Sequence, residues 1–258
     1  MLNQVTLKRS GNSYLVELSR PDRLNALDLE MWRELAEAIE GIAKTADIRC
    51  VVLAGAGGNF AAGADLAEFA TARDTPAAAT RYGQAMDRTL RAIRDCHLPT
   101  VAAIEGSCIG GGLQIAMACD LRIGAMGSRY GAPLARIGVV MPFPEIAYLV
   151  ELAGQATALE MLLEGRIYEA SEAKEKGLIG RVVEEGKALE EAIATSRRIE
   201  QGAPLSHRYH KRLVRRCLDP RPLTEEDYAE GFAVCASADY AEGIRAFLEK
   251  RKPVFKGR

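Results

Sequence analysis

Cysteine and histidine are scarce in this 258-residue chain, and neither forms a metal-binding pattern. The six cysteines form no Cys-x-x-Cys pair; they stand at positions 50, 96, 108, 119, 217 and 235. Of the histidines, His207 and His210 have a spacing that could place them on one helix face, but basic residues flank them. A solvated helix explains this pair better than a zinc site. We therefore expect no metal, free thiols and a reducing compartment, the cytoplasm.

The sequence also lacks an excess of charge of one sign and a long apolar run. Lys and Arg total 34 against 35 Asp and Glu, a formal net charge of −1. A nucleic-acid-binding protein normally has a basic excess, so we expect no nucleic-acid partner. No apolar run approaches the roughly 20 residues of a membrane span, so we expect no membrane association. The first ten residues show no signal-peptide core.

Strand and helix patterns alternate through the first part of the chain and predict an α/β core. We expect a β-hairpin over residues 4–18 and buried strands over 50–54 and 99–104. Helices are expected over residues 29–43, 84–95 and 110–119, and Ala77–Ala79 is expected to be only a surface helix or loop. We divide the chain into a core, residues 1–186, and a charged helical region, residues 187–258, which is either a solvated appendage or a packing arm for other subunits.

Two strand-to-helix turns contain small residues and have the same order of buried strand, turn and helix. One joins the strand at 51–53 to Asn59–Leu66, and the other joins the strand at 101–104 to Gly110–Gln114. Small side chains let a ligand approach the main chain, and a helix start leaves N–H groups unpaired. Two such turns side by side would form an oxyanion site with two donors. The sequence contains no P-loop motif, and neither a dinucleotide fingerprint nor a nucleophile elbow around Ser107 is supported.

Several segments together resemble the enoyl-CoA hydratase/isomerase (crotonase) family. The matching segments are 61–66 (AAGADL), 110–112 (GGG), 116–122 (AMACDLR), 20–27 (RPDRLNAL) and 247–253 (FLEKRKP). They span nearly the whole chain, but none of them specifies a reaction. The resemblance implies a ββα spiral core, a helical C-terminal trimerisation region, and a homotrimer or dimer of trimers.

The resemblance also implies an acyl-CoA thioester ligand. Its thioester oxygen would lie between the backbone N–H groups of Ala64 and Gly111, which would stabilise an enolate. By the same resemblance, the coenzyme A groove would be lined by Asp22, Arg23, Leu24, Ala62, Asp65 and Leu66. Phe247 and Lys250 would contact the nucleotide end, from the same or a neighbouring subunit. For Arg23 the alternative is an ordinary surface charge, and for Asp65 it is a helix cap.

The sequence departs from the hydratase pattern at both acid–base positions. Where the family has one glutamate after the glycines, this chain has Gln114, and where it has the second after Pro133, this chain has Leu134. An amide accepts no proton at neutral pH, and leucine has no acid–base chemistry. The nearest relocated carboxylate is Glu145, whose alternative role is to complement a helix dipole. Tyr130, Arg136 and Glu68 are weaker candidates, more simply explained as packing or surface residues.

We therefore predict an enzyme that stabilises an enolate of an acyl-CoA thioester, a lyase or isomerase but not an efficient hydratase of simple enoyl thioesters. Ala64, Gly111 and Glu145 are the predicted catalytic residues, and the coenzyme A moiety of the substrate is the only cofactor expected. The alternative is a catalytically silent acyl-CoA-binding protein or a subunit of an assembly.

Overall fold

A computed structural model describes residues 3–258 of the chain. Residues 1 and 2, the start of the alternating N-terminal segment, lie outside the described residues. A six-stranded sheet runs in the order β1-β2-β3-β4-β6-β9, and a three-stranded sheet runs β5-β7-β8. β1 pairs antiparallel with β2, and the other pairs in the larger sheet are parallel.

The strands are short, and from β4 to β7 they alternate between the two sheets. Their bounds are β1 Val5–Ser10, β2 Ser13–Leu18, β3 Cys50–Gly55, β4 Thr100–Ile104, β5 Ser107–Ile109, β6 Leu121–Ala125, β7 Arg129–Gly131, β8 Ile167–Glu169 and β9 Arg181–Val183. β4 lies in the large sheet, β5 in the small sheet, and α4 follows; β6, β7 and α5 repeat this order. The predicted α/β core with ββα units is therefore confirmed.

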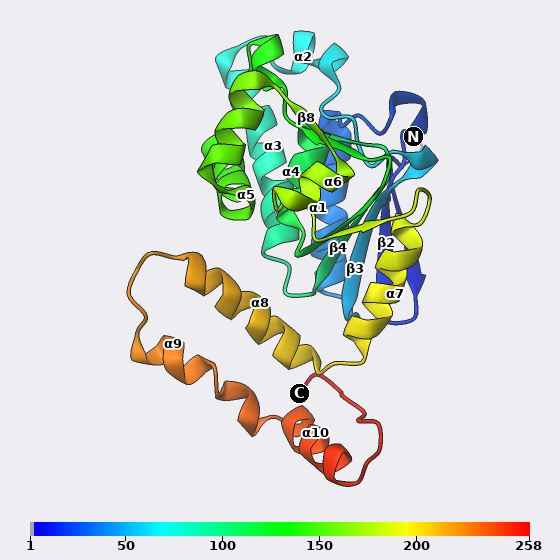
Figure 1. The fold of residues 1–258 in the computed structure, drawn as a ribbon, viewed down its shortest axis with the longest axis vertical. Coiled ribbons are helices and arrows are strands. Elements are labelled where there is room, and N and C mark those ends of the chain that lie inside the picture. Colours follow the sequence, from blue (N-terminus) through cyan, green and yellow to red (C-terminus); the bar gives the residue numbers. More distant parts are fainter. Residues whose placement is uncertain (1–2) are drawn as a thin grey trace.

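The helices cover both faces of the larger sheet (Figure 1). Their bounds are α1 Leu29–Ala43, α2 Leu66–Ala72, α3 Pro76–Arg94, α4 Gly111–Ala118, α5 Phe143–Glu164, α6 Ala170–Glu175, α7 Ala188–Glu200, α8 Pro204–Leu218, α9 Glu225–Glu230 and α10 Ala238–Leu248. Short 3-10 turns occupy η1 Pro21–Arg23, η2 Ala56–Gly58, η3 Leu134–Ile137 and η4 Ala233–Ala236. The helix predicted over residues 84–95 begins earlier, at Pro76, so Ala77–Ala79 lies in the first turn of α3, and β8 was not predicted.

The alternation of side chains in β3 explains the two layers of core. Val51 and Leu53 point to the main core, whereas Cys50 and Val52 point to the opposite face, where α7 packs. A strand with both faces buried has a continuous apolar sequence, as predicted for this segment. Since α7 covers the sheet, it packs as part of the core although it follows the predicted boundary between residues 186 and 187.

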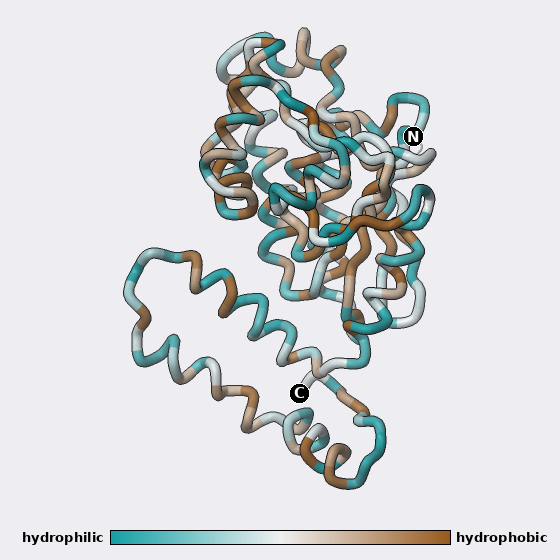
Figure 2. Tube along the Cα trace, in the orientation of Figure 1, coloured by the Kyte–Doolittle hydropathy of each residue, from teal (hydrophilic) through white to brown (hydrophobic). Residues whose placement is uncertain are grey.

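Residues 204–258 form a helical appendage that extends from the core at the end far from α2 (Figure 1). Asp120 fastens α8 to the core: its carboxylate pairs with Lys211 Nζ at 2.6 Å and Arg215 at 3.2 Å. The same carboxylate accepts from the N–H of Thr100 at 2.8 Å. Hydrophobic positions occur along the appendage as well as in the core (Figure 2). Those that lie exposed include Val214, Leu218, Tyr228, Phe232, Tyr240, Ile244, Phe247 and Leu248.

Within the described residues, α5 is the one helix long and apolar enough to cross a membrane. Its backbone is non-helical at Gly154, where φ is 78° and ψ is 163°, so it consists of two shorter helices. A soluble core helix can pass the same test. The expectation of no membrane partner stays a prediction.

Candidate active site

The first turn of the site, residues 61–64, is held between a loop and a strand. Leu27 N–H donates to Gly63 O at 2.8 Å, and Asp65 N–H donates to Leu27 O at 2.8 Å. These two bonds form a parallel bridge between Leu27 and Ala64, so the N–H of Ala64 points away from Leu27. On the other side, Ile109 N–H donates to Ala61 O at 3.0 Å. The first turn is therefore fixed from both directions.

The second turn, residues 110–112, opens α4 against the first one. Gly110 has a φ of 49°, a conformation that favours glycine, and its N–H donates to Gly131 O at 2.8 Å. A Cβ at Gly112 would lie 2.3 Å from Ala61 O. The missing side chain thus lets α4 pack directly on the backbone of the first turn.

The N–H groups of Ala64 and Gly111 have no acceptor within residues 3–258. Their turns touch: a Cβ at Gly63 would lie 3.9 Å from Gly111 N, and one at Gly110 would lie 3.7 Å from the Cα of Gly63. The Gly111 amide also stands in the first turn of α4, at the positive end of the helix dipole. The structure therefore brings the two predicted donors into one place.

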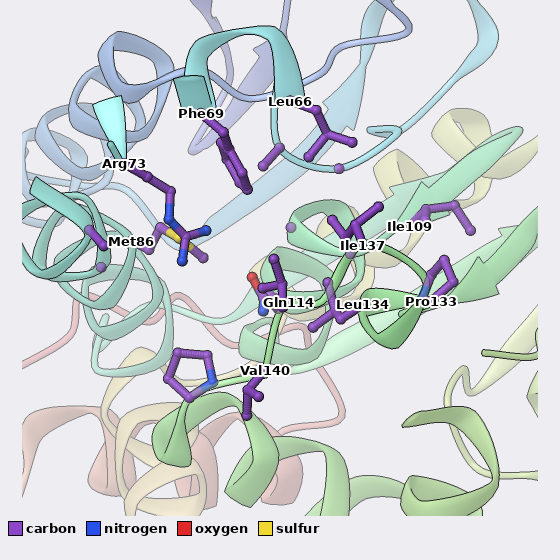
Figure 3. Close-up of a pocket in the computed structure, with 18 of the residues that line it drawn as sticks. Leu66, Phe69, Arg73, Met86, Ile109, Gln114, Pro133, Leu134, Ile137 and Val140 are labelled. Carbon is purple, nitrogen blue, oxygen red and sulfur yellow. The ribbon is translucent and has the colours of Figure 1, made fainter. Parts of the chain in front are cut away.

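Both turns line a cleft of about 570 Å³ with mostly apolar walls (Figure 3). Leu66 and Phe69 come from α2, Met86 from α3, and Leu134 and Ile137 from η3. Arg73 and Arg136 are the charged residues among those that line it, and no described carboxylate does so. An apolar, partly enclosed cleft with a few polar groups is typical of a small-molecule site.

Gln114 and Leu134, which occupy the two expected acid–base positions, both line the cleft. Gln114 stands one turn after Gly111 on α4 and is only 3% exposed. Its Oε1 atom is buried and has no hydrogen-bond partner. Leu134, the first residue of η3, is half-buried beside Pro133. The two positions that would hold a hydratase's carboxylates thus present an unpartnered amide and an alkyl group.

Glu145 lies in the first turn of α5, three residues beyond Pro142, and is 2% exposed. It does not line the cleft, although Pro142 does. Its Oε2 atom is buried without a hydrogen-bond partner. Burial raises the pKa of this carboxyl, and the negative charge of Asp87 raises it further. A buried acid with a raised pKa is suited to proton transfer, but its role stays a prediction.

Comparison with known proteins decides the family. The model of the family described as enoyl-CoA hydratase/isomerase matches residues 9–258. The chain belongs to the enoyl-CoA hydratase/isomerase family. It is 36% identical to a putative enoyl-CoA hydratase of Thermus thermophilus over 254 residues, which covers 95% of this chain and 98% of that protein. It is 31% identical to the short-chain-enoyl-CoA hydratase of Clostridium acetobutylicum, with 97% of each chain covered.

A solved structure agrees with this family assignment. The enoyl-CoA hydratase/carnithine racemase of Magnetospirillum magneticum has a TM-score of 0.96 and 46% identity, covering 100% of this chain and 97% of that one. The predicted resemblance and the crotonase-type fold class are therefore confirmed. The roles of the individual site residues stay predictions.

The loop that the family resemblance assigns to coenzyme A lies beside the first turn. Asp22, Arg23 and Leu24 are exposed in and after η1, and Ala62 N–H donates to Leu24 O at 3.0 Å. Of the other predicted groove residues, Ala62 and Leu66 line the cleft. The position of this loop is compatible with the predicted groove.

Asp65 caps α2, accepting from Ala67 N–H at 3.2 Å. It also pairs with Arg20 at 2.9 Å, and Arg20 pairs with Asp28, the cap of α1, at 3.2 Å. Arg20 thus links the starts of α1 and α2, and α2 contributes to the cleft wall. The capping alternative therefore describes the contacts of Asp65 in the structure.

Phe247 and Lys250 lie at the end of α10, at the opposite end of the molecule from α2 (Figure 1). Phe247 is 82% exposed. Within one chain, these residues do not meet the cleft. A contact with bound coenzyme A would have to come from another copy of the chain.

The weaker candidates have structural partners. Tyr130 is fully buried, and its hydroxyl lies 2.7 Å from Ser128 Oγ. Glu68 Oε2 accepts from Leu29 N–H at 2.9 Å at the start of α1. Burial raises the pKa of Glu68. Arg136 lines the cleft but donates to Gly165 O at 2.9 Å. None of these contacts identifies a proton-transfer role.

Sequence reasoning missed the cleft wall formed by Phe69, Arg73 and Met86. Phe69 and Arg73 are four residues apart, a spacing that places two side chains on one helix face. That signal was available, but it did not show which face would meet the glycine turns. The packing of α2 and α3 settles this point.

Proposed function

We propose that this chain is an enzyme that binds an acyl-CoA thioester in the cleft and stabilises the enolate of that thioester. The unpaired N–H groups of Ala64 and Gly111, side by side at the cleft, are the observation that supports this proposal most strongly. Preorganised amides of this kind are worth about 3 kcal/mol each to a developing oxyanion. The family's enoyl-CoA hydratases support the same ligand class.

We propose further that hydration of simple 2-enoyl thioesters is not the efficient reaction. Addition of water needs one group to activate the water and one to deliver the α-proton. Gln114 and Leu134 supply neither, and no described carboxylate lines the cleft. A lyase or isomerase reaction through the enolate, with Glu145 as the proton carrier, fits this arrangement better. Glu145 would reach the acyl group only if the segment around Pro142 shifts.

The absence of a carboxylate from the described cleft wall equally favours the alternative, a protein that binds acyl-CoA without converting it. The two functions differ in one property. An enzyme of the first kind exchanges or moves a proton on the acyl group, whereas a silent binding protein leaves the thioester unchanged.

Incubation of the purified protein with a panel of acyl-CoA thioesters in deuterated water tests these proposals. The panel holds 2-enoyl, 3-enoyl, 3-hydroxyacyl and carboxyacyl esters, followed by mass spectrometry. We expect double-bond migration, loss of CO₂ or deuterium uptake without net hydration. Rapid gain of water on the 2-enoyl ester would overturn the non-hydratase proposal, and tight binding with no conversion would favour the silent binding protein.

The exposed apolar side chains of the appendage support a homotrimer or a dimer of trimers. Leu218, Phe232 and Phe247 are among those left uncovered in a single chain. Apolar patches of this kind mark protein interfaces. Light scattering coupled to size-exclusion chromatography would give the mass in solution, and a mass of 28.0 kDa, that of one chain, would contradict this proposal. We place the enzyme in the cytoplasm and propose no cofactor beyond the substrate's coenzyme A.

A further inference from the structure

Arg73 follows α2 as its C-cap and directs its guanidinium into the cleft, toward Gln114 (Figure 3). The guanidinium carbon lies 4.5 Å from the ring centre of Phe69 and 5.5 Å from that of Tyr82. The two rings meet edge to face at 5.6 Å. Stacking on aromatic faces restricts the guanidinium and leaves its N–H edge free for a ligand.

No described carboxylate forms an ion pair with Arg73, and no hydrogen bond involves its side chain in residues 3–258. Arg20 differs, since it pairs with Asp28 and Asp65. The other arginine of the cleft wall, Arg136, donates to a backbone carbonyl. Arg73 is therefore the cleft's one cation with all its donors available, in surroundings that are mostly apolar.

A second polar group without a partner lines the same cleft. Gln114 is buried against the cleft, and its Oε1 atom has no partner. Figure 3 shows Arg73 and Met86 on one side of the cavity, and Ile109 and Pro133 on the other. The predicted coenzyme A loop lies by Ala62, which belongs to the first turn. Arg73 thus faces the same space as Gln114, one turn beyond the free amide of Gly111, where an acyl group held by the two amides would extend.

We propose that Arg73 recognises a carboxylate on the acyl group, so that the preferred substrate is a carboxyacyl-CoA thioester. The inference rests on the proposed function and names its substrate class. A guanidinium binds a carboxylate through two parallel N–H···O bonds, and apolar walls strengthen that attraction. A neutral acyl chain of the same length would leave Arg73 desolvated and unpaired, which costs affinity.

Isothermal titration calorimetry with matched ligands tests the inference. Glutaryl-CoA and pentanoyl-CoA share an acyl chain of five carbons and differ in one terminal carboxylate. The proteins are the wild type, Arg73→Met, Arg73→Lys, and Arg81→Met as a control for an exposed arginine of α3 outside the cleft. Thermal unfolding of each variant checks that it folds.

We expect the wild type and Arg81→Met to bind glutaryl-CoA at least tenfold more tightly than pentanoyl-CoA, as a charge-assisted hydrogen bond implies. Arg73→Met should remove this preference, bind pentanoyl-CoA at least as tightly as the wild type does, and leave the affinity for free coenzyme A unchanged. Arg73→Lys should keep part of it, because lysine retains the charge but not the paired geometry.

Other results would overturn the inference. Equal wild-type affinity for the two thioesters would show that the carboxylate is not recognised, while leaving the proposed function intact. An equal loss of affinity for glutaryl-CoA, pentanoyl-CoA and free coenzyme A in Arg73→Met would assign Arg73 to the coenzyme A phosphates. Failure of the wild type to bind any of these ligands would overturn the proposed function together with this inference.

Discussion

Replacing Gln114 and Leu134 together by glutamate should create hydratase activity. Both side chains face the cleft, Gln114 from α4 and Leu134 from η3, beside the free amides of Ala64 and Gly111. Gln114→Glu preserves the shape of the side chain, and Leu134→Glu enlarges it little at a half-buried position. The oxyanion donors stay in place, so the change supplies only the missing acid and base.

The size of the gain follows from the two roles. A positioned acid or base contributes about 10²–10⁴ in rate. At position 114 the side chain is 3% exposed, so burial will raise the pKa of a glutamate there and reduce its ionised fraction. We therefore take the lower end of this range and expect the double variant to hydrate about 10² times faster than the wild type. Each single variant should gain less than about tenfold, because the two groups act as a unit.

Loss of the ultraviolet absorbance of a conjugated 2-enoyl thioester measures the rate, and mass spectrometry confirms the added water. Leu134→Gln in the otherwise unchanged chain is the matched control, since it adds a polar side chain without a carboxylate. A double variant that folds and binds the thioester with wild-type affinity, yet hydrates no faster, would refute the proposal that the absence of these two carboxylates limits hydration.

Three further predictions concern stability. Gly112→Ala should lower the free energy of unfolding by about 1–3 kcal/mol, because its Cβ would overlap the first turn. The control Gly41→Ala lies in open space on α1 and should raise the free energy of unfolding by up to about 1 kcal/mol. Thermal unfolding measures both changes. Asp120→Asn should lower the free energy of unfolding by about 1–3 kcal/mol and speed proteolysis of the appendage. Its control, Glu190→Gln, removes an exposed ion pair and should lower the free energy of unfolding by under about 1 kcal/mol. Glu145→Gln should stabilise the protein at pH 8 by about 1 kcal/mol, a rise of roughly 2–4 °C in Tm, but not at pH 4.

The pH dependence expected for Glu145→Gln follows from the linkage between protonation and folding. Burial raises the folded-state pKa of Glu145 above its unfolded value. The protonated form is thus favoured in the folded state, and this contribution is present at acid pH and lost as the pH rises through the folded pKa. An equal difference between wild type and variant at pH 4 and pH 8 would contradict it. Resistance of Asp120→Asn to proteolysis would likewise show that α8 is held by other contacts.

The sequence allowed the central fold to be predicted because its strands have two buried faces. The apolar run at Cys50–Ala54 and the run ending at Ile104 became β3 and β4. β8 was missed because only the middle residue of its three is buried, so it has no recognisable period. The start of α3 was missed although Thr75 caps it and Pro76 follows, a pattern typical of a helix N-terminus.

In the site, the backbone groups could be predicted from the sequence, whereas the positions of the side chains could not. The amides of Ala64 and Gly111 could be predicted because glycine turns fix the main chain locally. Arg73 could not, because its role depends on how α2 packs across the cleft from α4. The position of Glu145 also depends on tertiary packing, since it lies three residues after Pro142 yet outside the cleft wall.

This division explains why family membership does not determine the reaction here. Two glycines hold the turns together: Gly112 packs against the first turn, and Gly110 has a positive-φ conformation. Under the proposed function, these turns provide an oxyanion site for any chemistry that passes through a thioester enolate. The choice among such reactions falls to the side chains on the cleft wall, where Gln114 and Leu134 remove the groups for hydration and Arg73 adds a cation. We therefore expect the names of the relatives to indicate the ligand class, and the acyl group and its fate to depend on these three positions.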